Sequence, residues 1–161
     1  RYPRGEGLGV KVSEELENYK IGVSKKIRLG KNIIILSFGS VINVCQDVSN
    51  KLNCTLIDMR FVKPIDENII NESIKKYSLI VTVEDNSIMG GAGSAVNEVI
   101  SKNNYQAKTL NIGVPDKFFS HATREEQLVD SGISADNIIK KIKKYIKNNN
   151  LYDLNHSSKI R

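Results

Sequence analysis

The sequence contains few of the residues that mark disulfide-rich, metal-binding or membrane proteins. Its 161 residues include only two cysteines and two histidines, and no tryptophan. The cysteines form no Cys-x-x-Cys pair and have no histidine at metal-ligand spacing. No apolar run approaches the roughly 20 residues that a membrane-spanning helix needs. We therefore expect one soluble domain with a real core, no metal site and no membrane partner.

Neither the cysteines nor the histidines suggest an active site. Cys45 and Cys54 fall within a predicted helix and a predicted strand, and we expect both to be reduced core thiols in a reducing compartment. His156 lies near the end of the chain, whereas His121 follows a predicted strand end, a place where sites occur. No serine or cysteine nucleophile with a supporting acid accompanies His121. We expect no catalytic residue in this chain.

Basic residues outnumber acidic ones, which gives a net charge of +6 at pH 7. Much of the excess is lysine in the last predicted helix, and aromatic residues make up only 6% of the chain. A basic balance with few aromatic residues favours solubility and weak association over a nucleic-acid interface. We expect no nucleic-acid partner.

Short apolar runs alternate with helical stripes of apolar residues along the chain. This alternation predicts an α/β fold of three layers, with a mainly parallel sheet of about five strands and helices on both faces. The predicted strands cover residues 32–38, 54–59, 79–83 and 108–112, with an edge strand near 23–29. The predicted helices cover residues 41–52, 66–76, a segment after the glycines at 90–93, a short piece from the capping box at Thr123 to about Gly132, and 134–147.

The strand at 79–83 leads into two acidic residues, Glu84 and Asp85, and then into a glycine-rich loop and a helix. Loops of this kind often bind phosphates. Here Val96 replaces the third glycine of a GxGxxG fingerprint, no P-loop lysine is present, and the two carboxylates would repel a pyrophosphate. Three interpretations stay open: a nucleotide site, a glycine hinge that packs the helix on the strand, and a surface that faces another domain or subunit. The hinge is favoured.

The first residues are irregular and basic, and we expect the chain to be part of a longer protein. Arg1 and Arg4 flank a proline on a glycine-rich stretch. A guanidinium offers a planar fork of donors that suits phosphate, so one interpretation is a phosphate anchor and the other is a solvated linker. Asp58 and Arg60, two positions apart, are expected to form a structural ion pair.

Four motifs occur in order along the chain: Arg-Tyr-Pro-Arg-Gly at 1–5, Asp-Met-Arg-Phe-Val-Lys-Pro-Ile-Asp-Glu at 58–67, the acidic and glycine-rich stretch at 81–94, and Leu-Asn-Ile-Gly-Val-Pro-Asp at 110–116. Together they closely resemble the carboxy-terminal part of the 1-deoxy-D-xylulose-5-phosphate synthase family. That family belongs to the transketolase-like enzymes that depend on thiamine diphosphate. The resemblance covers residues 1 to 147; Asp85 stands where the family usually has glutamate, and the polar tail at 148–161 departs from the pattern.

The resemblance implies that the complete protein condenses pyruvate with D-glyceraldehyde 3-phosphate, with loss of carbon dioxide, and supplies isoprenoid, thiamine and pyridoxal synthesis. It implies thiamine diphosphate and Mg²⁺ as cofactors, which that family binds in its two upstream domains. No GDG-type motif occurs in this chain, so no cofactor residue is carried over to it. Arg4 matches the arginine that grips the phosphate of the aldehyde, and Arg1 is a weaker match for the same neighbourhood.

The same resemblance implies a division of the chain. Residues 1–10 would be the exit of a pyrimidine-binding domain, 11–31 a linker with an edge strand, and 32–147 a transketolase C-terminal-like domain. This domain would be architectural: it would support the upstream domains and add to a homodimer contact. Glu84 and the glycine loop would then belong to interdomain packing.

Two alternatives stay open. One is the carboxy-terminal domain of a 2-oxoacid dehydrogenase β subunit, which has no need of a phosphate-binding Arg-Tyr-Pro-Arg start because lipoamide is its acceptor. The other is a free-standing, non-catalytic dimerisation module. The bias toward Lys, Asn and Ile indicates an AT-rich genome. We expect a bacterial cytoplasm, with a plastid-type organelle as the alternative.

Overall fold

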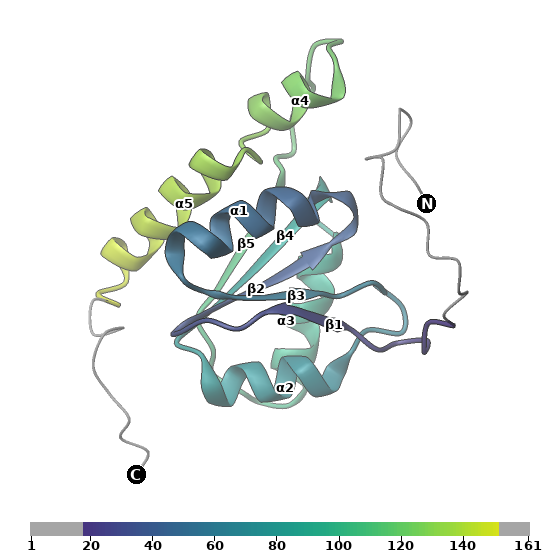
Figure 1. Ribbon diagram of the computed structural model, residues 1–161, viewed down its shortest axis with the longest axis vertical. Helices are drawn as coiled ribbons and strands as arrows, with labels where there is room; N and C mark the ends of the chain where they lie inside the picture. The colour runs from purple at the N-terminus through teal and green to yellow at the C-terminus, as the bar shows by residue number, and fades with distance from the viewer. Residues whose placement is uncertain (1–17, 152–161) are drawn as a thin grey trace.

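The computed structural model describes residues 18–151, in which five strands form a sheet that carries helices on it (Figure 1). The strands are β1 (Lys25–Arg28), β2 (Ile33–Phe38), β3 (Thr55–Asp58), β4 (Leu79–Ser87) and β5 (Thr109–Val114). The helices are the 3-10 turn η1 (Gly39–Val41), α1 (Ile42–Leu52), α2 (Glu67–Lys76), α3 (Ala92–Lys102), α4 (Arg124–Asp130) and α5 (Ala135–Asn148). The strand order is β1-β3-β2-β4-β5, and only β1 is antiparallel to its neighbour.

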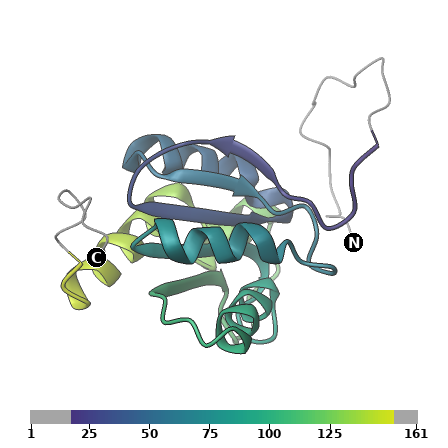
Figure 2. The same ribbon diagram turned by 90° about the horizontal axis from the view of Figure 1, so that it is seen from below.

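Helices cover both faces of the sheet, as Figures 1 and 2 show. On one face, α1 and α5 close a core that includes Ile35 and Val81. On the other face, α2 and α3 close a second core that includes Ile34 and Ile80. Adjacent residues of a strand point to opposite faces, so each central strand supplies both cores. The predicted α/β fold, with three layers and a mainly parallel sheet, is confirmed.

The central and edge strands differ in burial as their sequences predict. All six residues of β2 are buried, because β3 and β4 flank it and helices cover both of its faces. β1 is an edge strand that pairs antiparallel with β3 and exposes Lys25 and Lys26. Charge on a short edge strand discourages pairing with other chains. The edge strand predicted near residues 23–29 is thus confirmed.

Two strands are longer than predicted. The prediction ended β4 at residue 83, ahead of its two carboxylates, whereas the strand continues to Ser87. Glu84 lies opposite Phe38 of β2 and is only 3% exposed. Carboxylates are rarely buried unless they are paired, and Glu84 is tolerated here because the same chain supplies its partners. β5 likewise runs to Val114, past its predicted end at 112.

The last two helices begin where the sequence predicts. Thr123 and Glu126 form a reciprocal capping box at the start of α4, and Ser134 caps α5. The apolar stripe of α5 packs against α1 and β5, and its lysines are exposed except Lys141, which donates a hydrogen bond to the Gly132 carbonyl at 3.0 Å. Between residues 18 and 151, no helix combines the length and apolar character needed to cross a bilayer.

Both cysteines are free thiols that are fully buried in the core beneath α1. Burial raises the pKa of Cys45 to about 12 and that of Cys54 to about 11. Because the thiolate is the reactive form of cysteine, burial and a raised pKa both suppress reaction at neutral pH. The prediction that they are core thiols is confirmed.

We predict that neither Cys45 nor Cys54 is alkylated by iodoacetamide at pH 8 while the chain is folded. Both should be alkylated in concentrated urea, where unfolding exposes the thiols and returns each pKa to its ordinary value. Mass spectrometry of the treated chain counts the added groups. Equal labelling rates in buffer and in urea would contradict the burial of these residues.

Candidate functional site

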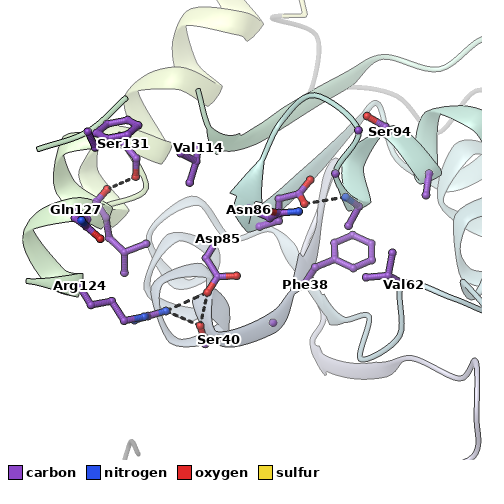
Figure 3. A pocket seen from close by; sticks show the side chains of 18 of the residues that line it. Phe38, Ser40, Val62, Asp85, Asn86, Ser94, Val114, Arg124, Gln127 and Ser131 are labelled. Carbon is purple, nitrogen blue, oxygen red and sulfur yellow. Dashed lines mark hydrogen bonds and ion pairs between the residues drawn. The ribbon is translucent and has the colours of Figure 1, made fainter. Parts of the chain in front are cut away.

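A cavity of about 1170 Å³ opens at the carboxyl ends of the parallel strands (Figure 3). It lies where the strand order reverses, since β3 flanks β2 on one side and β4 and β5 follow on the other. Such a reversal is where α/β proteins bind ligands. Ser40 follows β2, Arg60 follows β3, and Asp85 and Arg124 belong to β4 and α4. This cavity is the strongest candidate for a functional site in the described part of the chain.

Glu84 is the only charged residue that is buried among residues 18–151, and it lies in the wall of this cavity. Its two carboxylate oxygens accept hydrogen bonds from the backbone N–H groups of Ala92 and Gly93, each at 2.8 Å. Those N–H groups belong to the first turn of α3, where helix amides lack partners and the helix dipole is positive. The start of α3 therefore compensates the buried negative charge.

This contact decides among the interpretations of the glycine loop. A phosphate cannot use the first amides of α3, because the carboxylate of Glu84 already occupies them. A Cβ atom at Gly91 would overlap the Glu84 carboxylate and the Ser87 carbonyl, so this position requires glycine. The loop thus packs helix against strand, as the hinge interpretation holds. The Glu84 side chain is directed to the start of α3 in its own fold, and the interdomain packing that the resemblance implies stays a prediction.

Asp85 points into the cavity and joins Ser40 and Arg124 there (Figure 3). Its Oδ2 accepts hydrogen bonds from Ser40 Oγ at 2.7 Å and from Arg124 Nη2 at 3.2 Å. Arg124 Nη2 also donates to Ser40 Oγ at 2.5 Å. The cluster fastens α4, which has no buried residue of its own, to the ends of β2 and β4. No pattern in the sequence predicts this cluster, since Ser40 and Arg124 are 84 positions apart.

Arg60 is the second arginine of the cavity, and it pairs with Asp58. Arg60 Nε lies 3.8 Å from Asp58 Oδ2, and the Arg60 backbone N–H donates to Asp58 Oδ1 at 3.1 Å. The predicted structural ion pair is therefore confirmed. Its geometry differs from a continuing strand, because β3 ends at Asp58 and Arg60 has a left-handed backbone with φ of 58°.

The charges named above are matched within the chain itself. Asp58 matches Arg60, Asp85 matches Arg124, and the start of α3 matches Glu84. A charged substrate would have to displace one of these partners and leave the other without compensation, which is unfavourable in a partly buried site. The arrangement therefore does not favour acid–base chemistry by Asp58, Asp85 or Glu84.

Exposed apolar side chains adjoin the cavity. Val62 lines it and is 52% exposed, while Met89 and Phe118 are each next in sequence to a lining residue and are also largely exposed. Exposed apolar side chains that form a large contiguous patch mark a surface that contacts protein. These three side chains are compatible with such a contact.

The sequence-predicted site residues are not brought together in the described region. Arg1 and Arg4 lie outside residues 18–151, so their phosphate-binding role stays a prediction. His121 lines the cavity. Within residues 18–151, no three His, Cys, Asp or Glu side chains gather closely enough to hold a metal ion.

A family model and several known proteins match most of this chain. The family model described as the C-terminal domain of transketolase matches residues 22–138. The 1-deoxy-D-xylulose-5-phosphate synthases of Histophilus somni (strain 2336) and Haemophilus influenzae (strain 86-028NP) are 44% and 46% identical to it over 146 residues. Each match covers 91% of this chain but only 24% and 23% of those proteins, so the chain spans about a quarter of their length.

Solved structures share the fold. A split-gene transketolase, described as an inactive β4 tetramer, has a TM-score of 0.74 and 27% identity, with 81% of this chain and 44% of that chain covered. Transketolase from Campylobacter jejuni has a TM-score of 0.56 with 83% of this chain and 20% of that chain covered. Its identity is 14%, so this second likeness concerns the fold alone.

We predict that Glu84→Ala lowers the free energy of unfolding by about 2 to 4 kcal/mol, because two buried amides of α3 lose their acceptor. Glu84→Gln should cost less, since its amide oxygen can still accept one hydrogen bond. Urea unfolding followed by circular dichroism measures both variants. Ser94→Ala is the matched control on the same helix, because the Ser94 hydroxyl makes only a 3.3 Å hydrogen bond to the Ile88 carbonyl. Equal losses for Glu84→Ala and Ser94→Ala would contradict the capping role.

Proposed function

Because the chain belongs to the transketolase C-terminal domain family, we propose that it is the carboxy-terminal part of a 1-deoxy-D-xylulose-5-phosphate synthase. The observation that carries the proposal is its 44 to 46% identity to synthases of that name over 91% of the chain. This similarity also favours the synthase over a 2-oxoacid dehydrogenase β subunit. The complete protein then condenses pyruvate with D-glyceraldehyde 3-phosphate and releases carbon dioxide.

The cofactors of the complete protein are thiamine diphosphate and Mg²⁺, and we assign both to the domains that precede this one. The residues of the described region do not fit either group. The first amides of α3, where a diphosphate would bind, already hold the Glu84 carboxylate. Between residues 18 and 151, no cluster of acidic residues, histidines or cysteines suits a metal ion.

The domain itself serves as a support. Its matched charges and exposed apolar side chains suit the cavity to contact with the upstream domains, and its remaining surface adds to a homodimer contact. The split-gene transketolase, described as a β4 tetramer, supports association between copies. The division into an upstream exit at 1–10, a linker at 11–31 and this domain at 32–147 belongs to the same proposal. We place the complete protein in a bacterial cytoplasm.

Activity should require the complete protein. With thiamine diphosphate and Mg²⁺ added, the 161-residue chain alone should form no product from pyruvate and D-glyceraldehyde 3-phosphate, whereas the chain preceded by its upstream domains should form 1-deoxy-D-xylulose 5-phosphate. Product analysis by mass spectrometry distinguishes the two, and sedimentation of the complete protein should give a dimer. Product from the isolated chain, or none from the complete protein, would refute the proposal.

Arg4 is proposed to bind the phosphate of the aldehyde, on the strength of the Arg-Tyr-Pro-Arg-Gly motif. Arg4→Ala in the complete protein should raise the Michaelis constant for D-glyceraldehyde 3-phosphate and leave that for pyruvate nearly unchanged, because only the aldehyde carries phosphate. Arg1→Ala, a weaker match to the motif, should have a smaller effect. Steady-state kinetics with each substrate varied in turn measures both. An equal rise for the two substrates would remove Arg4 from this role.

A further inference from the structure

The second half of the motif at residues 58–67, with Pro64 and Asp66, has no place in the function described so far. Asp58 is the last residue of β3, and Arg60 follows it two positions later. At the other end of the motif, Asp66 caps α2 and Glu67 is the first residue of that helix. We call residues 60–66 the clamp loop. The loop contacts residues 19–24, which lead into β1 and which we call the incoming segment. Three contacts join the two.

The first contact is polar and centres on Asp66. Asp66 Oδ2 accepts hydrogen bonds from the backbone N–H of Ser24 at 2.9 Å and from its hydroxyl at 2.7 Å. Asp66 Oδ1 accepts the N–H of Ile69 at 3.2 Å, so the same carboxylate caps α2. Burial alone would raise the pKa of Asp66, but hydrogen bonds from Ser24, Ile69 and Asn68 outweigh it and hold that pKa below its ordinary value.

The second contact is aromatic. The guanidinium carbon of Arg60 lies 4.2 Å from the centroid of the Tyr19 ring, within the range of a cation–π interaction. The ion pair with Asp58 orients the Arg60 side chain, which is only 21% exposed. Tyr19, in contrast, is 63% exposed. Tyr19 therefore lies on a guanidinium that the domain already holds in place.

The third contact is steric. Gly22 has a left-handed backbone with φ of 74°, in a turn that the Val23 N–H closes on the Lys20 carbonyl at 3.2 Å. A Cβ atom at Gly22 would approach Pro64 Cγ to 3.0 Å. The turn thus lies directly against Pro64. The three contacts follow the same order in both segments: Tyr19 contacts Arg60, Gly22 contacts Pro64 and Ser24 contacts Asp66.

We propose that the clamp loop fixes the incoming segment against the domain and so sets how the domain is oriented relative to the chain that precedes it. The incoming segment is the covalent link through which residues 1–10 reach the sheet. Holding it at Tyr19, Gly22 and Ser24 limits the directions in which the preceding chain can leave the domain. This gives the motif at 58–67 a positioning role, distinct from binding a substrate. Only the kinetic consequence of this proposal rests on the proposed function.

The test uses the complete protein with two double variants. Tyr19→Leu with Ser24→Ala removes the ring and the hydroxyl, whereas Tyr19→Phe with Ser24→Thr keeps both features and serves as the matched control. Trypsin cuts after Lys20, which lies inside the incoming segment, and after Lys108, which is exposed in the loop before β5 and serves as the internal reference. Mass spectrometry gives the ratio of the two cuts under native conditions.

In the Tyr19→Leu, Ser24→Ala variant, cleavage after Lys20 relative to Lys108 should rise about tenfold, because proteolysis follows the population of the released segment. The Michaelis constant for D-glyceraldehyde 3-phosphate should rise severalfold, since a mobile link misplaces the residues ahead of it. The control should match the unaltered protein in both measurements. Equal cleavage in the two variants overturns the proposal, and so does faster cleavage with unchanged kinetics. If the complete protein forms no 1-deoxy-D-xylulose 5-phosphate, the proposed function fails while the cleavage ratio still decides the clamp.

Discussion

The contact between the Glu84 carboxylate and the first amides of α3 is the constraint on which this end of the fold depends. A buried carboxylate usually needs a cation, and here two N–H groups and the positive end of a helix take its place. The contact fixes where α3 begins against β4, and it requires Gly91 to lack a side chain. It allows β4 to continue to Ser87, whose carbonyl lies against Gly91. The shape of the cavity follows from this packing.

Matching of charges within the chain also engages these groups at the position where α/β proteins usually bind ligands. At the strand-order reversal of many α/β proteins, the first amides of a helix receive a phosphate. In this domain a strand carboxylate receives them, and the two arginines of the cavity, Arg60 and Arg124, are held by Asp58 and Asp85. The first amides of α3 and these two arginines are therefore already paired within the chain.

Much of the fold could be predicted from the sequence, because the signals lie within a few residues of one another. The apolar run of β2 predicts a strand covered on both faces, and the capping box of Thr123 and Glu126 predicts the start of α4. The candidate site could not be predicted in this way. Ser40, Asp85 and Arg124 come from three parts of the chain, and no pattern near any of them indicates the other two.

The sequence by itself determined the alternation of strands and helices, the layers of the sheet and the core thiols, since hydrophobic periodicity is a local property of the chain. Apart from the Asp58–Arg60 pair, which the sequence predicts, only the tertiary structure decided the roles of the charges. The sequence does not indicate that Glu84 caps the first turn of α3, nor that Asp66 accepts hydrogen bonds from Ser24. Whether a charge is neutralised depends on which distant groups the fold brings within hydrogen-bond distance. No short stretch of residues indicates which groups these will be.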